Sequence, residues 1–126
     1  MGRGVVADGY RSFAFGQSFA DEENYIFEPT QTYGNYAFAF GEGTSADGNY
    51  SFAFGQGTRA HNSYEVAFGK YNRSQMSNTL FSIGNGTSDT NRSNLFQINQ
   101  DGTVYIMNLT TNKLVSLQSL LNLSTT

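Results

Sequence analysis

Few side chains in this sequence of 126 residues have the chemistry for acid–base catalysis or metal binding. His61 is the only histidine and there is no cysteine, so thiolate metal sites and disulfide bonds are excluded. A histidine can act as a general base, but His61 takes the place that Asp47 fills 14 residues earlier in a repeat described below. A solvated turn residue accounts for both positions. We therefore expect no catalytic residue, no metal site and no cofactor.

A short acidic run is the other group of titratable side chains. Successive side chains of an extended chain diverge, so residues 21–23 do not form a catalytic carboxylate pair or a cation cage. The apolar and aromatic residues 25–27 follow, and such a mixed segment is a candidate receptor-binding loop. Two alternatives stay open: the acidic run only keeps a loop soluble, or Ile26 and Phe27 plug a subunit interface or cap a fold. The candidate receptor-binding residues are Asp21, Glu22, Glu23, Tyr25, Ile26 and Phe27.

The elements that position these residues follow from a repeated block of the type aromatic-Ala-Phe-Gly. Its glycines Gly41, Gly55 and Gly69 are each 14 residues apart, within three consecutive copies at 33–46, 47–60 and 61–74. A unit this short cannot bury a core of its own, and it matches one turn of a solenoid whose turns stack on each other. We therefore predict a rod in which the chain coils as a β-solenoid and its 14-residue turns stack on each other.

Each copy places two large apolar residues on either side of a small one, the period-two pattern of a short strand. Stacking aligns these residues in columns. We expect the large side chains to fill the interior of each coil, and the alanines to permit close approach of another backbone. Tyr36, Tyr50 and Tyr64 form a further column, which we interpret as a structural ladder rather than a glycan site. The predicted structural core is Phe13, Phe15, Phe38, Phe40, Phe52, Phe54, Val66, Phe68, Phe81 and Ile83.

One turn of the repeat is enlarged. Gly16 and Gly41 are 25 residues apart, 11 more than the regular period. We place the extra residues in 19–32, which contains Pro29, the only proline. Because insertions in solenoids leave the stack as loops on one face, this segment is expected to protrude.

The composition indicates how such a rod is stabilised. Hydrophobic residues make up 38% of the chain, and among them are eleven Phe and eight Tyr. A single thin chain of this kind would bury too little apolar surface, so we infer a homo-oligomer. Net charge is -3 and the basic residues are scattered, which excludes the electrostatic footprint of a nucleic-acid binder. No apolar run has the length of a membrane span, and the first residues do not resemble a signal peptide.

The pattern changes after residue 75. The segments 95–98 and 103–106 flank Asp101-Gly102 and predict a β-hairpin with Phe96, Ile98, Val104 and Ile106 on one face. Leucines then recur at spacings of three and four, which predicts a short helix or the first heptad of a coiled coil. These coiled-coil candidates are Leu114, Leu117 and Leu121. The resulting division is a β-roll at 1–74, a β-rich module at 75–107 and a helical stalk or coiled-coil start at 108–126.

The 14-residue blocks resemble the head repeats of trimeric autotransporter adhesins (YadA-like heads). Phe-Ala-Phe-Gly stands where that family has Val-Ala-Ile-Gly, and Thr44-Ser-Ala46 and Thr58-Arg-Ala60 stand for its Ser-x-Ala. The resemblance covers about residues 7–74 and implies a left-handed parallel β-roll in a homotrimer. This chain differs from the family in its aromatic pairs and its enlarged turn, and we expect no membrane-anchoring barrel to follow. Residues 78–106 resemble a module of phage tail-fibre and baseplate proteins, in which similar head repeats often precede it.

Together these resemblances imply a non-enzymatic structural and host-binding segment of a homotrimeric phage tail fibre, located in the virion tail. The alternative is the head of a bacterial trimeric autotransporter adhesin at the cell surface. Partners would be two further copies of the chain and a host cell-surface glycan or protein, without nucleic acid or membrane insertion. Two less favoured hypotheses are a glycan depolymerase, which needs convergent carboxylates, and an ice-binding solenoid with a flat array of threonines such as Thr44 and Thr58.

Overall fold

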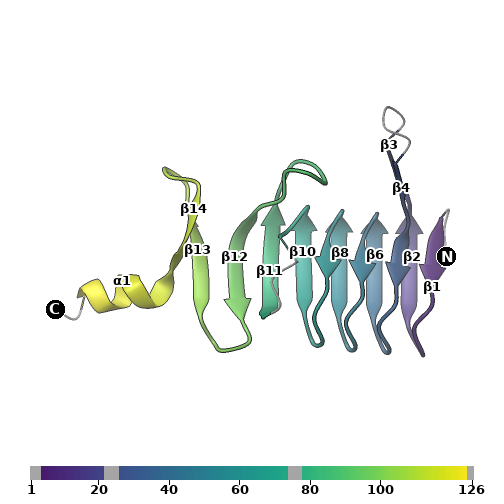
Figure 1. Ribbon diagram of the computed structural model, residues 1–126, viewed down its shortest axis with the longest axis horizontal. Helices are drawn as coiled ribbons and strands as arrows, with labels where there is room; N and C mark the ends of the chain where they lie inside the picture. The colour runs from purple at the N-terminus through teal and green to yellow at the C-terminus, as the bar shows by residue number, and fades with distance from the viewer. Residues whose placement is uncertain (1–3, 22–25, 74–77, 125–126) are drawn as a thin grey trace.

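The computed structural model describes residues 4–21, 26–73 and 78–124, which form an elongated row of strands followed by one helix (Figure 1). The elements are β1 (Val5–Ala7), β2 (Phe13–Gln17), β3 (Phe19–Asp21), β4 (Ile26–Glu28), β5 (Thr30–Thr32), β6 (Phe38–Glu42), β7 (Ser45–Ala46), β8 (Phe52–Gln56), β9 (Arg59–Ala60), β10 (Val66–Lys70), β11 (Thr79–Asn85), β12 (Asn94–Asn99), β13 (Val104–Asn108), β14 (Lys113–Ser116) and α1 (Leu117–Ser124).

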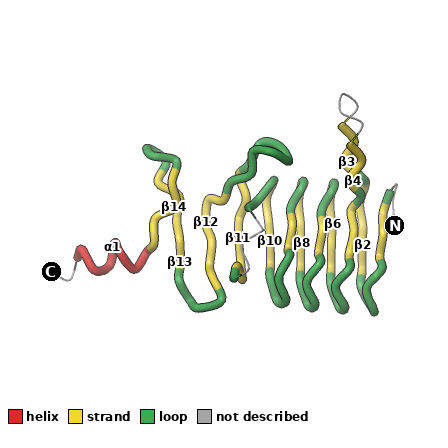
Figure 2. Tube along the Cα trace, in the orientation of Figure 1, coloured by secondary structure: helices red, strands yellow, loops and turns green. Residues whose placement is uncertain are grey.

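Most of the row is a parallel β-solenoid of about four turns with about 14 residues in each regular turn. A turn contributes one strand to each of two sheets, and the connecting loops stack along the edges (Figure 2). The long sheet has the order β14-β13-β12-β11-β10-β8-β6-β2, and the short sheet has the order β1-β5-β7-β9. The predicted all-β parallel solenoid is therefore confirmed.

The strand register follows the sequence repeat. Phe38 pairs with Phe52, which pairs with Val66, so the predicted column is present. Phe13 of β2 pairs directly with Phe38 of β6, although 25 residues separate them. The chain between them forms an antiparallel hairpin of β3 and β4 that leaves the stack (Figure 1). This hairpin lies within residues 19–32, where the sequence places the enlarged turn.

The interior of the roll contains small side chains. Ala39, Ala53 and Ala67 of the long sheet are fully buried and cluster with Ala46 and Ala60 of the short sheet. Fully buried threonines continue this layer, and Thr30 Oγ1 donates to the carbonyl oxygen of Gln17 at 2.8 Å. Because only two short strands complete a turn, the two sheets lie too close for larger residues. The core is therefore a ladder of Ala, Ser and Thr.

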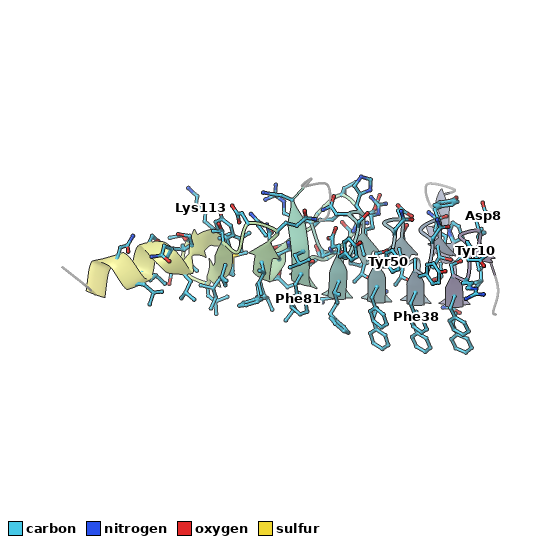
Figure 3. All side chains as sticks on the ribbon, turned by 90° about the horizontal axis from the view of Figure 1, so that it is seen from below. Asp8, Tyr10, Phe38, Tyr50, Phe81 and Lys113 are labelled. Atoms are coloured by element: carbon cyan, nitrogen blue, oxygen red, sulfur yellow. The ribbon has the colours of Figure 1, made fainter. Side chains whose placement is uncertain are left out.

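The predicted placement of the aromatic pairs inside the roll is wrong. Phe13 is 49% exposed and Phe54 is 42% exposed, and Figure 3 shows Phe38 and Phe81 projecting from the outer side of the long sheet. Successive side chains of a strand point to opposite faces, so burial of the alanines places their neighbours outside. The correction applies to all ten residues of the predicted structural core, because none of them is buried in the chain. They occupy the outer face of the long sheet, which we call the Phe face. The Phe face consists of Phe13, Phe15, Phe38, Phe40, Phe52, Phe54, Val66, Phe68, Phe81 and Ile83.

Close stacking of the turns explains the glycines after each strand. Gly55 has φ +132°, and a Cβ at this position would collide with the carbonyl oxygen of Gly69 in the next turn. At the opposite edge of the roll, Tyr36, Tyr50 and Tyr64 adopt the left-handed conformation with φ between 55° and 65°. Non-glycine residues rarely occupy this region, so the stacked turns impose it.

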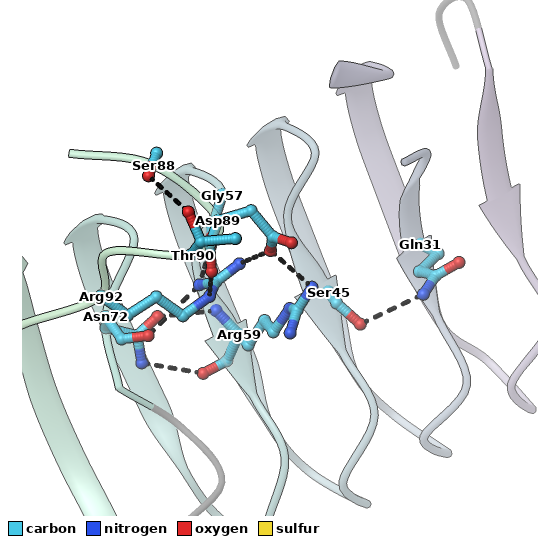
Figure 4. Close-up of polar contacts among 9 residues, drawn as sticks. All are labelled: Gln31, Ser45, Gly57, Arg59, Asn72, Ser88, Asp89, Thr90 and Arg92. Atoms are coloured by element: carbon cyan, nitrogen blue, oxygen red, sulfur yellow. Dashed lines mark hydrogen bonds and ion pairs between the residues drawn. The ribbon is translucent and has the colours of Figure 1, made fainter. Parts of the chain in front are cut away.

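Asparagine side chains terminate the short sheet, in which β9 is the last strand among the described residues. Asn72 lies where Thr44 and Thr58 lie in earlier turns, and its amide replaces a neighbouring strand. Its Oδ1 accepts from the N–H of Arg59 at 2.8 Å and its Nδ2 donates to the carbonyl oxygen of Arg59 at 3.0 Å (Figure 4). Asn94 makes the same pair of bonds with the backbone of Arg73. These bonds satisfy edge groups that would otherwise be buried without partners.

Beyond the roll the long sheet becomes antiparallel. β11 pairs with β10 in parallel and with β12 in antiparallel orientation. β12 and β13 form the predicted hairpin, with Phe96 opposite Ile106 and Ile98 opposite Val104. The assignment of Leu114 to a coiled coil is wrong, because Leu114 lies in β14 and pairs with Met107. Leu117 and Leu121 lie in α1, and both are exposed.

Candidate binding surfaces

The Phe face is a continuous strip of stacked aromatic rings. Ring centroids of Phe13 and Phe38 are 5.0 Å apart, and those of Phe38 and Phe52 are 4.9 Å apart, with nearly parallel planes. A second column runs beside the first, with Phe40 and Phe54 at 5.2 Å. The strand spacing of a parallel sheet brings the rings into contact. Apolar patches this extended are typical of interaction surfaces rather than of ordinary solvent-exposed faces.

The tyrosine column at the edge of the roll is also stacked. Ring centroids of Tyr36 and Tyr50 are 5.2 Å apart and those of Tyr50 and Tyr64 are 5.4 Å apart. Asparagines join the same turns, since the N–H of Asn35 donates to Asn49 Oδ1 at 3.0 Å. The rings of Tyr36 and Tyr64 cover both faces of Tyr50, which are the faces that a sugar ring would use. The geometry supports the interpretation as a structural ladder.

The β3–β4 hairpin contains the candidate receptor-binding loop. Asp21 ends β3 and is the strand partner of Ile26, and Ala20 is the partner of Phe27. The hairpin thus brings the backbone of Asp21 next to that of Ile26 and Phe27 at a point that projects from the rod (Figure 1). Three further candidates, Glu22, Glu23 and Tyr25, lie outside the described residues.

A network of ion pairs fixes the loop between β11 and β12. Asp89 Oδ1 lies 2.6 Å from Arg92 Nη2 and 3.0 Å from Arg59 Nη2 (Figure 4). Arg92 also donates from Nη1 to the carbonyl oxygens of Gly57, at 2.7 Å, and Asn72, at 3.2 Å. The hydrogen bond from Arg92 and the positive charge of Arg59 lower the pKa of the Asp89 carboxyl. The scattered basic residues of the sequence gave no indication of this network, because its partners come together only in the fold.

The buried carboxyl group of Glu65 is a second feature that the sequence did not indicate. Its Oε1 accepts from the backbone N–H groups of His61, at 3.0 Å, and Asn62, at 2.9 Å, while its Oε2 has no partner in the described part of the chain. Burial raises the pKa of Glu65 to about 7. The buried Glu65 side chain thus binds the backbone of the turn at residues 61–62. Ala37 and Ser51 occupy the same position in earlier repeats.

Neither the ion-pair network of Asp89 nor the buried carboxyl of Glu65 has the arrangement of a hydrolytic site. The His61 side chain is exposed, and what its backbone contributes is the N–H that binds Glu65. Within residues 4–21, 26–73 and 78–124, no three His, Cys, Asp or Glu side chains are grouped so that they could hold a metal ion. No helix in these ranges is long and apolar enough to cross a membrane.

Comparison with known proteins identifies the repeat. Residues 33–58, which include β6, β7 and β8, match the YadA head domain repeat in two copies. No curated protein and no solved structure matches the chain. The matched residues are consecutive turns of the parallel roll, in which Ala39 and Ala53 are stacked and buried. The chain therefore carries YadA-type head repeats, the repeats of trimeric autotransporter adhesin heads.

Proposed function

We propose that this chain is a non-enzymatic, surface-binding segment of a homotrimeric rod, in which three copies meet through the Phe face. The exposed aromatic strip is the observation that carries this proposal. In the described part of the chain, the buried hydrophobic residues are alanines and Tyr71, so one copy gains little from apolar burial. Each Phe side chain that becomes fully buried adds about 1.5–3 kcal/mol. Assembly on the Phe face thus supplies the core that the small-residue interior lacks.

The β3–β4 hairpin is the proposed contact with a host cell-surface glycan or protein. It interrupts an otherwise regular stack and projects from it, and recognition loops are commonly carried on a rigid scaffold in this way. Its backbone places the acidic end of β3 beside the apolar residues Ile26 and Phe27. The hypothesis that these two residues instead plug the subunit interface remains the alternative for the same segment.

Two parent proteins are compatible with such a rod. We favour a phage tail fibre in the virion tail, because the β11–β13 region follows the head-type repeats directly and resembles a tail-fibre and baseplate module. The second candidate is the head of a bacterial trimeric autotransporter adhesin at the cell surface, which the match of residues 33–58 favours. The purified protein should block phage adsorption to bacteria in the first case, and should bind animal or plant host cells instead in the second.

The remaining hypotheses gain no support from the fold. An ice-binding array needs exposed threonines, but Thr44 and Thr58 are fully buried between the sheets. A depolymerase needs carboxylates that converge, either in one chain or across the interface. We propose that the rod lacks this activity, and release of reducing ends from host polysaccharides would contradict the proposal.

Light scattering and a cell-binding assay test the proposed function together. The mass in solution should be about three times the chain mass of 13.8 kDa. Replacing residues 20–27 by a short Gly-Ser turn should preserve that mass and weaken binding to host cells. The replacement must spare Thr30, which is buried in β5 and bonded to two neighbouring carbonyl oxygens. A monomeric mass would contradict the trimer, and unchanged cell binding would contradict the role of the hairpin.

A further inference from the structure

A cavity of about 660 Å³ lies where the roll gives way to the antiparallel strands. One wall is the loop of residues 86–93, and another is the β13–β14 turn. The side chains that matter for its chemistry are Arg73, Asn85, Arg92, Met107, Lys113 and Leu114. We refer to it as the end cavity.

The end cavity opens on the side of the long sheet that faces away from the Phe face. Buried Ala67 aligns with Ser82, Gln97 and Tyr105 in successive strands, so these residues mark the inner side. Met107 follows Tyr105 by two residues and shares this side, and Leu114 pairs with Met107. The short sheet covers the inner side along the roll, and β9 is its last strand in the part of the chain that the structure describes. Figure 3 accordingly shows Lys113 and Phe81 on opposite sides, so a trimer joined on the Phe face leaves the cavity open.

The lining is positively charged in a chain of net charge -3. It contains Arg73, Arg92 and Lys113, and no Asp or Glu lines it among the residues that the structure describes. Arg92 is held by the carboxylate of Asp89 and by three backbone carbonyl oxygens. Arg73 and Lys113 are exposed, and no ion pair involves either side chain in the described ranges. Two cations are thus available to an anionic ligand.

The lining also offers contacts for a polar ring. Asn85 also lines the cavity, and its buried Oδ1 has no hydrogen-bond partner among the described residues. Met107 and Leu114 supply an apolar wall, which suits the C–H face of a sugar. The loop of residues 86–93, which forms the other wall, is held in place by two contacts. Asn91 Nδ2 donates to Thr87 Oγ1 at 2.8 Å within the loop, and Arg92 anchors the loop to the roll.

We propose that the end cavity binds an anionic saccharide, with its carboxylate between Arg73 and Lys113 and its ring against Met107 and Leu114. The volume is within the range of about 300–1,000 Å³ that is typical of ligand pockets. The inference rests on the proposed surface-binding function, but it concerns a site separate from the β3–β4 hairpin. It names a ligand class for the rod: sugars that carry a carboxylate, as sialylated and uronic-acid glycans do.

Titration of the isotope-labelled protein with 3′-sialyllactose and with trigalacturonate tests the proposal by NMR. At least one of these probes should shift the side-chain amide of Asn85 at millimolar concentration, and lactose should not. Arg73→Gln and Lys113→Gln should each weaken binding by about fivefold or more, since each removes a charge-assisted contact. Arg11→Gln is the matched control, because it removes one cation at the other end of the roll, and it should leave the affinity unchanged.

Three results would overturn the proposal: no shift with either acidic probe, equal binding of lactose, or unchanged affinity in both cavity variants. Added salt should weaken the interaction, because the two cations remain partly exposed. The same samples give their mass by light scattering and their cell binding separately. A trimer that binds cells but neither acidic probe would refute only the end cavity, and a monomer that binds a probe would refute only the proposed assembly.

Discussion

At the scale of single residues, Glu65 links the interior of the roll to pH. Burial raises the pKa of its carboxyl from 4.5 in the reference state to about 7. Between these values the folded chain binds a proton that the unfolded chain releases, so the contribution to stability is largest at low pH and declines as the pH rises through 7. Neutral Glu65 is the form that suits its buried position, where Oε2 lacks a partner in the described chain.

Glu65→Gln should therefore flatten the pH dependence of unfolding. The free energy of unfolding of the wild-type protein should fall relative to that of the variant between about pH 5 and about pH 8. Denaturant titration of both proteins at one protein concentration measures this difference, and contributions from other titrating groups cancel. A difference that is the same at both pH values would show that the Glu65 carboxyl does not titrate in this range.

Gly55 illustrates a different residue-scale constraint, the lack of space between turns. Gly55→Ala should destabilise the protein by several kcal/mol, because the new Cβ meets the carbonyl oxygen of Gly69 and the positive φ adds strain. Gly102→Ala is the matched control: Gly102 has φ +92° but open space around it, so only the conformational cost of about 1–2 kcal/mol remains. Thermal unfolding followed by circular dichroism compares the two, and equal losses would rule out the backbone clash.

At the scale of elements, Asn72 ends the short sheet with its side chain. Asn72→Ala should lower the free energy of unfolding by about 2–4 kcal/mol. The substitution removes both hydrogen bonds that the Asn72 side-chain amide makes with the backbone N–H and carbonyl groups of Arg59. Asn72→Asp keeps the acceptor for the Arg59 N–H but buries a carboxylate oxygen against the carbonyl oxygen of Arg59, so at neutral pH a loss at least as large is expected. Hydrogen exchange at the Arg59 amide reports the effect locally, and unchanged protection in Asn72→Ala would show that the amide is not the cap.

The elements were predictable from the sequence to the extent that they repeat. The period of 14 residues gave the parallel stack, the columns and the position of the inserted hairpin. The alternation of large and small residues shows that a strand has two different faces but not which face is inside. The length of one turn decides this, because so short a coil has room only for side chains such as Ala53 between its sheets. The Asp89–Arg92 network and Glu65 follow no repeat and therefore had no counterpart in the sequence pattern.

The leucines near the carboxyl end show the same limit in a non-repeating segment. Spacings of three and four predict one helical face, yet Leu114 pairs with Met107 in the sheet and the helix begins at Leu117. One heptad does not distinguish a helix from a strand that ends within it. Of the three predicted leucines, Leu117 and Leu121 lie in α1.

At the scale of the whole molecule, the Phe face predicts that assembly and stability are coupled. Phe54→Asp would place a charge in the centre of the proposed interface, where burial without a partner is costly. The variant should lose the trimeric mass in light scattering and unfold at a lower temperature. Its monomer exposes the remaining rings of the strip, so it should also bind a hydrophobic dye.

Tyr33→Asp is the matched control for this prediction. Tyr33 is also an exposed aromatic residue, but it lies in the turn position that Asp47 and His61 fill in the next two repeats, so an aspartate fits there. This variant should keep the mass and unfolding temperature of the wild-type protein. If Phe54→Asp behaved in the same way, the Phe face would be a solvent-exposed surface of the rod, and the subunits would have to meet elsewhere. If both variants dissociated, the interface would extend around the edge of the roll to the turns, where the tyrosine ladder lies.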